Sequence, residues 1–137
     1  MGAQPTPGQS QQSLLNLPSN ALGYVAVLAA LVTGVLHLVL APRVLGFSQL
    51  MGILFILNGL GFVGGLLVYL TRFWRREFYL VAAVYSVVTI LALFVFQGFS
   101  IEAFYMRGSI NPMAVITKVA ELVLAVVAVL LYGNADA

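Results

Sequence analysis

The sequence predicts an all-α membrane protein, folded as an antiparallel four-helix transmembrane bundle. Hydrophobic residues make up 62% of the 137-residue chain and charged residues only 7%, against roughly 45–50% and about 25% in soluble domains. Four apolar segments also reach the length of about 20 residues that a helix needs to cross a bilayer. These segments do not alternate apolar and polar residues as barrel strands do, so helices are the expected spanning element.

The order of the elements follows from this hydropathy pattern. Residues 1–20 are rich in Gln, Pro and Ser and contain no Lys or Arg, which predicts a disordered tail and not a cleavable signal. Pro42 is expected to end the first span, and Asn111 and Pro112 are expected to cap and begin the fourth. A short C-terminal tail follows. The expected spans are residues 21–41, 47–70, 78–97 and 112–132, and the tail is 133–137.

The connections predict how the spans are arranged. The first two are short, so the helices that they join should be antiparallel neighbours. The third is longer and amphipathic over residues 99–108. We expect Ser100 to cap a short helix that ends at Gly108 and lies on the membrane surface, with a re-entrant loop as the alternative.

Positive charges predict the orientation in the membrane. The second connection contains Arg72, Arg75 and Arg76, whereas the first and third contain Arg43 and Arg107 and have Lys118 nearby. Short cytoplasmic loops carry an excess of Lys and Arg. The compact arginine cluster therefore places both termini in the cytoplasm, in a multi-pass protein of the cell membrane.

Small residues mark the faces on which the helices should pack. Ala26, Ala30 and Gly34 recur every four positions in the first span, and Gly61 and Gly65 have the same spacing in the second. Such spacing lets helix backbones approach closely in lipid, where packing and hydrogen bonds hold helices together. These five residues are the predicted helix-packing positions.

The strongly polar side chains of the spans are expected to gather in one leaflet's half of the bundle. This predicted cluster contains His37, Asn58, Gln97, Lys118 and Glu121. An ionisable group within a span costs about 2.5–3.5 kcal/mol on insertion scales, which by default suggests a function.

Two readings of this cluster remain open. In the first, Lys118 and Glu121 form an internal pair, three residues apart, that packs the fourth helix against the first. In the second, they belong to a small polar pocket in which Glu121 accepts a proton or cation and His37 titrates near neutral pH.

The sequence also argues against several chemistries. There is no cysteine, and the net charge of +2 comes from few charged residues, so we expect no thiolate chemistry and no nucleic-acid partner. We identify no catalytic constellation. His37 is a candidate haem ligand, and Met51, Met106 or Met113 is a candidate second ligand. No spacing motif supports a haem site, however. His37 and Glu121 fall short of the three or four ligands of a metal site, so we expect no metal and no cofactor.

Three segments carry a resemblance to a known family: GVLHLVLAP, GILFILNGLGFVGG and the basic turn RFWRRE. Together they resemble small four-span membrane proteins of unknown function found in archaea, over about residues 21–132. The resemblance implies the four-span fold and no particular activity.

Two classes of function follow from this sequence. The first is a non-catalytic accessory or structural bundle, in which the polar cluster fixes the register of the helices. The alternative is a small transporter or proton-coupled carrier that uses the cluster to bind or relay its substrate. The expected partners are the lipid bilayer and either a second copy of the chain or a membrane partner subunit.

Overall fold

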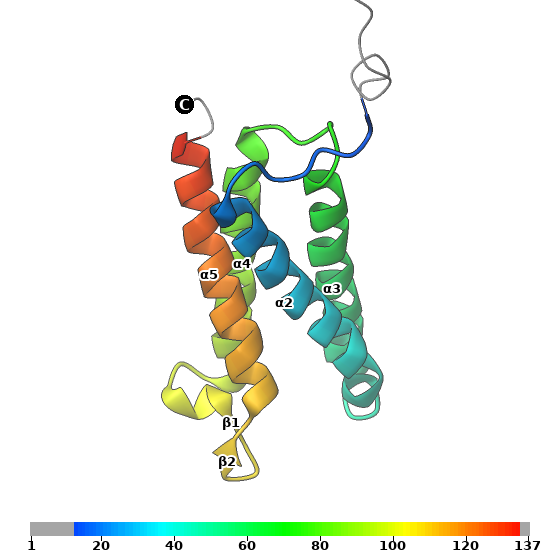
Figure 1. The fold of residues 1–137 in the computed structure, drawn as a ribbon. Coiled ribbons are helices and arrows are strands. Elements are labelled where there is room, and N and C mark those ends of the chain that lie inside the picture. The colour runs from blue at the N-terminus through cyan, green and yellow to red at the C-terminus, as the bar shows by residue number, and fades with distance from the viewer. Residues whose placement is uncertain (1–12, 135–137) are drawn as a thin grey trace, which may run out of the picture.

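The computed structural model describes residues 13–134 and contains four long helices joined by short connections (Figure 1). Each is long and apolar enough to cross a membrane. The predicted helical bundle is therefore confirmed. The helices are α2 (Ala21–Leu45), α3 (Gln49–Tyr69), α4 (Glu77–Gln97) and α5 (Pro112–Asn134).

Most helix ends lie near the expected positions, but α2 continues past its predicted end. The Asn20 side chain caps its start by accepting a hydrogen bond from the Gly23 amide at 3.0 Å. The helix then runs through Pro42 to Leu45 and ends at Gly46. Proline lacks an N–H group but has a helical φ, so it removes a backbone hydrogen bond without forcing the helix to end at once. At the start of α5, the Asn111 side chain accepts from the Met113 amide at 3.2 Å.

The helices α2 and α5 form the centre of the bundle. They pack on each other, α3 packs on α2, and α4 packs on α5. The helices α3 and α4 run antiparallel, as their short connection predicted, but they make little direct backbone contact. Each of them packs on a different central helix, and this leaves a seam between α3 and α4.

Small residues allow the closest helix approaches, but they are only partly the predicted ones. Ala26 and Ala30 are buried in the core. A Cβ built on Gly59 would lie 3.0 Å from the Gly34 carbonyl oxygen, so α2 and α3 touch at Gly34 and Gly59. Gly65 is exposed, and a Cβ there would meet nothing within 4 Å. Within the chain, Gly65 therefore does not have its predicted packing role. The glycine of α3 that packs closely on α2 is Gly59, which lies on a different face of α3.

Gly61, the other predicted packing residue of the second span, faces α4. A Cβ built on it would overlap the Tyr85 hydroxyl group. Gly61 therefore provides room for a tyrosine side chain and does not bring two helix backbones together.

The third connection differs from the expected surface helix. Ser100 caps a short 3₁₀ helix, η1 (Ile101–Phe104), and a two-stranded hairpin follows, made of β1 (Tyr105–Met106) and β2 (Ser109–Ile110). The residues between the strands, Arg107 and Gly108, have φ values of 54° and 83°. Positive φ at both central positions is typical of a tight hairpin turn. The predicted helix to Gly108 is thus wrong, because the short helix ends at Phe104 and the chain reverses direction at Arg107 and Gly108.

The segment before α2 pairs with the α3–α4 connection. Leu15 lies opposite Thr71 in an antiparallel bridge, and the Asn16 amide donates to the Leu70 carbonyl at 2.7 Å. The part of the predicted disordered tail that is described is therefore held by backbone hydrogen bonds, and residues 1–12 lie outside the described residues. At the other terminus α5 includes Asn134, and the rest of the predicted tail, 135–137, is also outside.

Different helix ends and connections lie at the two ends of the bundle. The start of α2, the end of α5 and the α3–α4 connection lie at one end, and the α2–α3 turn and the hairpin lie at the other (Figure 1).

Candidate functional site

The centre of the site is an ion pair on one face of α5. Lys118 Nζ lies 2.8 Å from Glu121 Oε1, and the two residues are three positions apart. The Glu121 side chain is completely buried, and that of Lys118 is 11% exposed. Residues three apart on a helix face one another, so the local structure of α5 alone is sufficient to form this pair.

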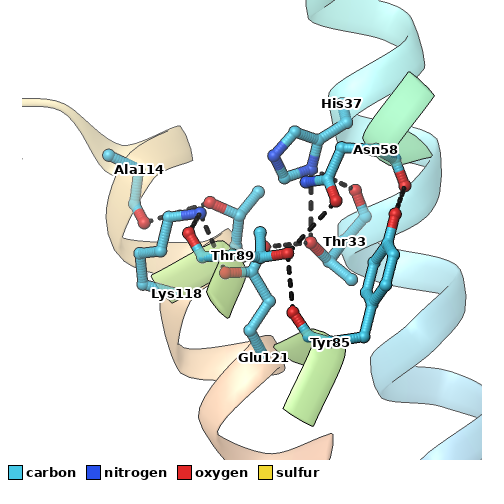
Figure 2. A network of polar contacts seen from close by, with 9 residues as sticks. Thr33, His37, Asn58, Tyr85, Thr89, Ala114, Lys118 and Glu121 are labelled. Carbon is cyan, nitrogen blue, oxygen red and sulfur yellow. Dashed lines mark hydrogen bonds and ion pairs between the residues drawn. The ribbon is translucent and has the colours of Figure 1, made fainter. Parts of the chain in front are cut away.

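Thr33 of α2 satisfies the second carboxylate oxygen. Its hydroxyl group donates to Glu121 Oε2 at 2.6 Å, and Thr33 is itself completely buried. Figure 2 shows the Glu121 carboxylate between the Thr33 hydroxyl and the Lys118 ammonium group. The contact joins the two central helices of the bundle, and it leaves both oxygens of Glu121 with a donor.

His37 extends this arrangement along α2. Its Nδ1 atom lies 2.8 Å from the Thr33 carbonyl oxygen and 3.3 Å from the Thr33 hydroxyl oxygen. Because a carbonyl only accepts, Nδ1 must carry the proton. The Thr33 hydroxyl directs its own hydrogen to Glu121 and can therefore accept from His37. The second ring nitrogen, Nε2, is left with a free lone pair.

A second set of contacts joins α3 to α4 across their seam. The Thr89 hydroxyl donates to Asn58 Oδ1 at 3.1 Å, and the Tyr85 hydroxyl donates to the Asn58 carbonyl at 3.0 Å. Lys118 Nζ reaches the Thr89 carbonyl at 3.5 Å. Through Lys118, the network therefore includes residues of all four helices (Figure 2).

The structure brings four of the five predicted cluster residues together. His37, Asn58, Lys118 and Glu121 take part in the network described above. Gln97 is exposed at the end of α4 and, within the described part of the chain, is not hydrogen-bonded to the other four.

Three further residues of the network were missed by the sequence reasoning: Thr33, Tyr85 and Thr89. They are polar residues within spans, where a hydroxyl group often bonds its own helix backbone. Thr89 does this too, since its hydroxyl oxygen also lies 2.9 Å from the Tyr85 carbonyl, and its single hydrogen is shared between that carbonyl and Asn58 Oδ1. The available signal for Thr33 was its spacing, four residues before His37 on the same helix face.

A cavity of about 890 Å³ lies along the α3–α4 seam, next to the polar network. His37, Asn58, Thr89 and Lys118 contribute to its wall, and Arg43 lies on its wall too. No Asp or Glu of the described residues lines it, and Glu121 in particular does not. A smaller, mostly apolar cavity of about 300 Å³ shares Gly61 and Tyr85 with the first.

This geometry determines what the site can do chemically. Both oxygens of Glu121 are occupied, and the carboxylate is separated from the cavity, so it is placed to hold Lys118 and α2. Among the described residues, the cavity wall offers hydrogen-bonding groups such as those of His37, Asn58 and Thr89. Within residues 13–134, no three His, Asp or Glu side chains come close enough together to hold a metal ion.

The fold and the site define a class of protein: a multi-pass helical membrane protein with a buried ion pair on α5 that is hydrogen-bonded to α2. The chain belongs to the family of unknown function DUF7475, whose model matches residues 8–132. This agrees with the resemblance to an uncharacterised four-span family. Comparisons with curated proteins and with solved structures found no match.

Proposed function

We propose that the protein is a non-catalytic accessory component of the membrane, in which the polar network holds four helices in one register. The observation that supports this proposal is the burial of the Glu121 carboxylate and its hydrogen bonding. Its carboxylate is completely buried and accepts from Lys118 on its own helix and from Thr33 on α2.

A carrier that binds or relays a proton or cation through Glu121 would need this carboxylate to be within reach of its substrate. Glu121 does not line the cavity, and each of its oxygens already has a donor. In lipid, polar side chains that face a bundle hold helices together through such hydrogen bonds. The arrangement therefore favours a structural role for the pair over a relay.

We also propose a cell-membrane location with both termini in the cytoplasm. Arg72, Arg75 and Arg76 lie in the α3–α4 connection, at the same end as the start of α2 and the end of α5. Lys118 is paired within its helix, so it does not count as a loop charge. When Lys118 is not counted, the α3–α4 connection has more positive charges than the opposite end of the bundle, where Arg43 and Arg107 lie. The positive-inside rule therefore favours this orientation.

The proposed structural role is tested by removing the charges one at a time. Glu121→Gln leaves the Lys118 ammonium group without its counterion, and breaking a buried pair typically costs about 3–5 kcal/mol. Because Lys118 is partly exposed and borders the cavity, we expect about 2–3 kcal/mol here. The readouts are abundance in the membrane and resistance of the purified protein to unfolding.

The double variant Glu121→Gln/Lys118→Met should recover most of this loss, because no unpaired charge remains. Glu77→Gln, on an exposed side chain at the start of α4, is the matched control and should behave like the wild type. If Glu121→Gln is as abundant and as stable as the control, the proposed structural role is wrong.

A further inference from the structure

The seam between α3 and α4, which pack on different central helices, is an open part of the bundle. It contains a cavity of about 890 Å³, within the range of about 300–1,000 Å³ typical of small-molecule sites. A second cavity adjoins it at Gly61 and Tyr85 and continues toward Tyr69 and Trp74 at the other end of the helices. We call these two cavities together the α3–α4 cleft.

One part of the cleft carries unused hydrogen-bonding capacity. His37 Nδ1 is bonded to Thr33, so its Nε2 can accept a hydrogen bond. Asn58 uses its side-chain oxygen and its backbone carbonyl, and its amide nitrogen has no partner within residues 13–134. Both residues line the cavity. The wall therefore presents an acceptor and a donor to the same space.

The charge of this region favours a neutral ligand group. Among the described residues, the ionised side chains that line the main cavity are Lys118 and Arg43, and Glu121 compensates Lys118 at 2.8 Å. His37 lies six residues before Arg43, about 9 Å along the helix axis, and Arg43 is exposed. An anionic group at the level of His37 would have no uncompensated cation beside it, and burying an unpaired charge is costly.

Much of the remaining wall of the cleft is apolar and lies between two helices that barely touch, and its further polar residues Arg43, Gln97 and Asn111 lie toward the hairpin end. Leu57, Val88 and Ala92 line it beside the polar groups, and Val81 and Ala82 line its continuation. A hydrocarbon chain that enters from the bilayer can lie along this wall without exposing polar backbone groups, because each helix satisfies its own.

From these observations we propose that the α3–α4 cleft binds one molecule of a neutral, single-chain amphiphile whose head carries a hydroxyl group. The hydroxyl donates to His37 Nε2 and accepts from the Asn58 amide, and the tail follows the seam toward Trp74. This proposal goes beyond the structural role of the ion pair, because neither His37 Nε2 nor the Asn58 amide is part of that pair.

The test uses monoolein as the neutral probe and oleate as its anionic counterpart with the same tail. Native mass spectrometry of the protein released from detergent micelles should show a monomer with one bound monoolein. Asn58→Leu removes the donor, and Thr89 still bonds the Tyr85 carbonyl, so we expect a folded protein with about fivefold weaker binding.

A steric variant tests the place of binding. Ala92→Phe fills the cavity from α4, and we expect it to weaken monoolein binding by about tenfold or more. The matched control is Val95→Phe, less than one turn away on the same helix, where the side chain is 64% exposed and does not line the cleft. It should bind as the wild type does. If Ala92→Phe fails to fold, Val88→Phe narrows the same wall.

Several results would overturn the proposal. These are equal binding of oleate and monoolein, undiminished binding by the folded steric variants, or a dimer without bound amphiphile, which would mean that a second copy fills the cleft. Monoolein binding that survives in Glu121→Gln/Lys118→Met separates this proposal from the structural role of the ion pair, since each can fail without the other.

Discussion

Replacing Thr33 with valine tests the contact that joins the two central helices. Thr33→Val keeps the branched shape and removes the hydroxyl group that donates to Glu121 Oε2 at 2.6 Å. His37 keeps the Thr33 backbone carbonyl as its partner at 2.8 Å. The substitution therefore removes the short hydrogen bond to a fully buried carboxylate, together with the longer contact between the Thr33 hydroxyl and His37 Nδ1 at 3.3 Å.

Two known ranges guide the expected loss of stability in Thr33→Val. Interhelical hydrogen bonds in a membrane protein average about 0.6 kcal/mol with a maximum of about 1.7, whereas hydrogen bonds to charged groups contribute about 1.5–3 kcal/mol. Because Thr33 and Glu121 are both completely buried, water cannot replace the lost donor. We therefore expect Thr33→Val to lower the free energy of unfolding by about 2 kcal/mol.

The assay is reversible unfolding in mixed micelles by a denaturing detergent, followed by circular dichroism. Thr33→Ser keeps the hydroxyl group and serves as the matched control, with a small loss from the missing methyl group. In the Glu121→Gln/Lys118→Met background, Thr33→Val should cost less, because the acceptor is no longer charged. A cost of Thr33→Val equal to that of Thr33→Ser would show that the hydrogen bond between Thr33 and Glu121 does not stabilise the bundle.

Three further outcomes are expected. Gly59→Ala should destabilise the protein by more than about 1 kcal/mol, since a Cβ there meets Leu38 and the α2 backbone, whereas Gly64→Ala meets nothing within 4 Å and should be neutral or slightly stabilising in the same unfolding assay. Arg76→Gln removes a guanidinium group that lies 4.1 Å from the centre of the Tyr132 ring and donates to the Tyr132 carbonyl at 3.1 Å. The last turn of α5 should lose about 1 kcal/mol of local stability, and its amide hydrogens should therefore exchange faster. In a chain without natural cysteine, a membrane-impermeant maleimide applied to intact cells should label Ser109→Cys and not Ser13→Cys; the reverse pattern would contradict the proposed orientation.

The hydropathy of the sequence predicted the four helices because lipid requires about 20 apolar residues for each span. It could not predict the end of α2, since a proline in the last turn costs one hydrogen bond and the helix can continue beyond it. The hairpin after Phe104 was missed because Arg107 stands at a positive φ, a conformation that few non-glycine residues adopt.

The candidate site was predicted in part for a similar reason. The spacing of Lys118 and Glu121 on one helix led to their pairing as one of the two interpretations of the cluster. The contact between Glu121 and Thr33 depends on how α2 and α5 cross, and the pattern of a single helix does not contain that information. The α3–α4 cleft depends on each helix packing on a different partner, which a short connection between them does not reveal.

We infer that lipid covers most of this surface, since Leu, Val, Ile and Phe side chains are exposed along all four helices. The most direct test is extraction of isolated membranes with alkaline carbonate, which removes peripheral proteins and leaves spanning ones. We expect the full chain to stay in the membrane pellet and to be released only by detergent. Recovery of folded protein in the aqueous supernatant would contradict the four-span structure and the roles derived from it.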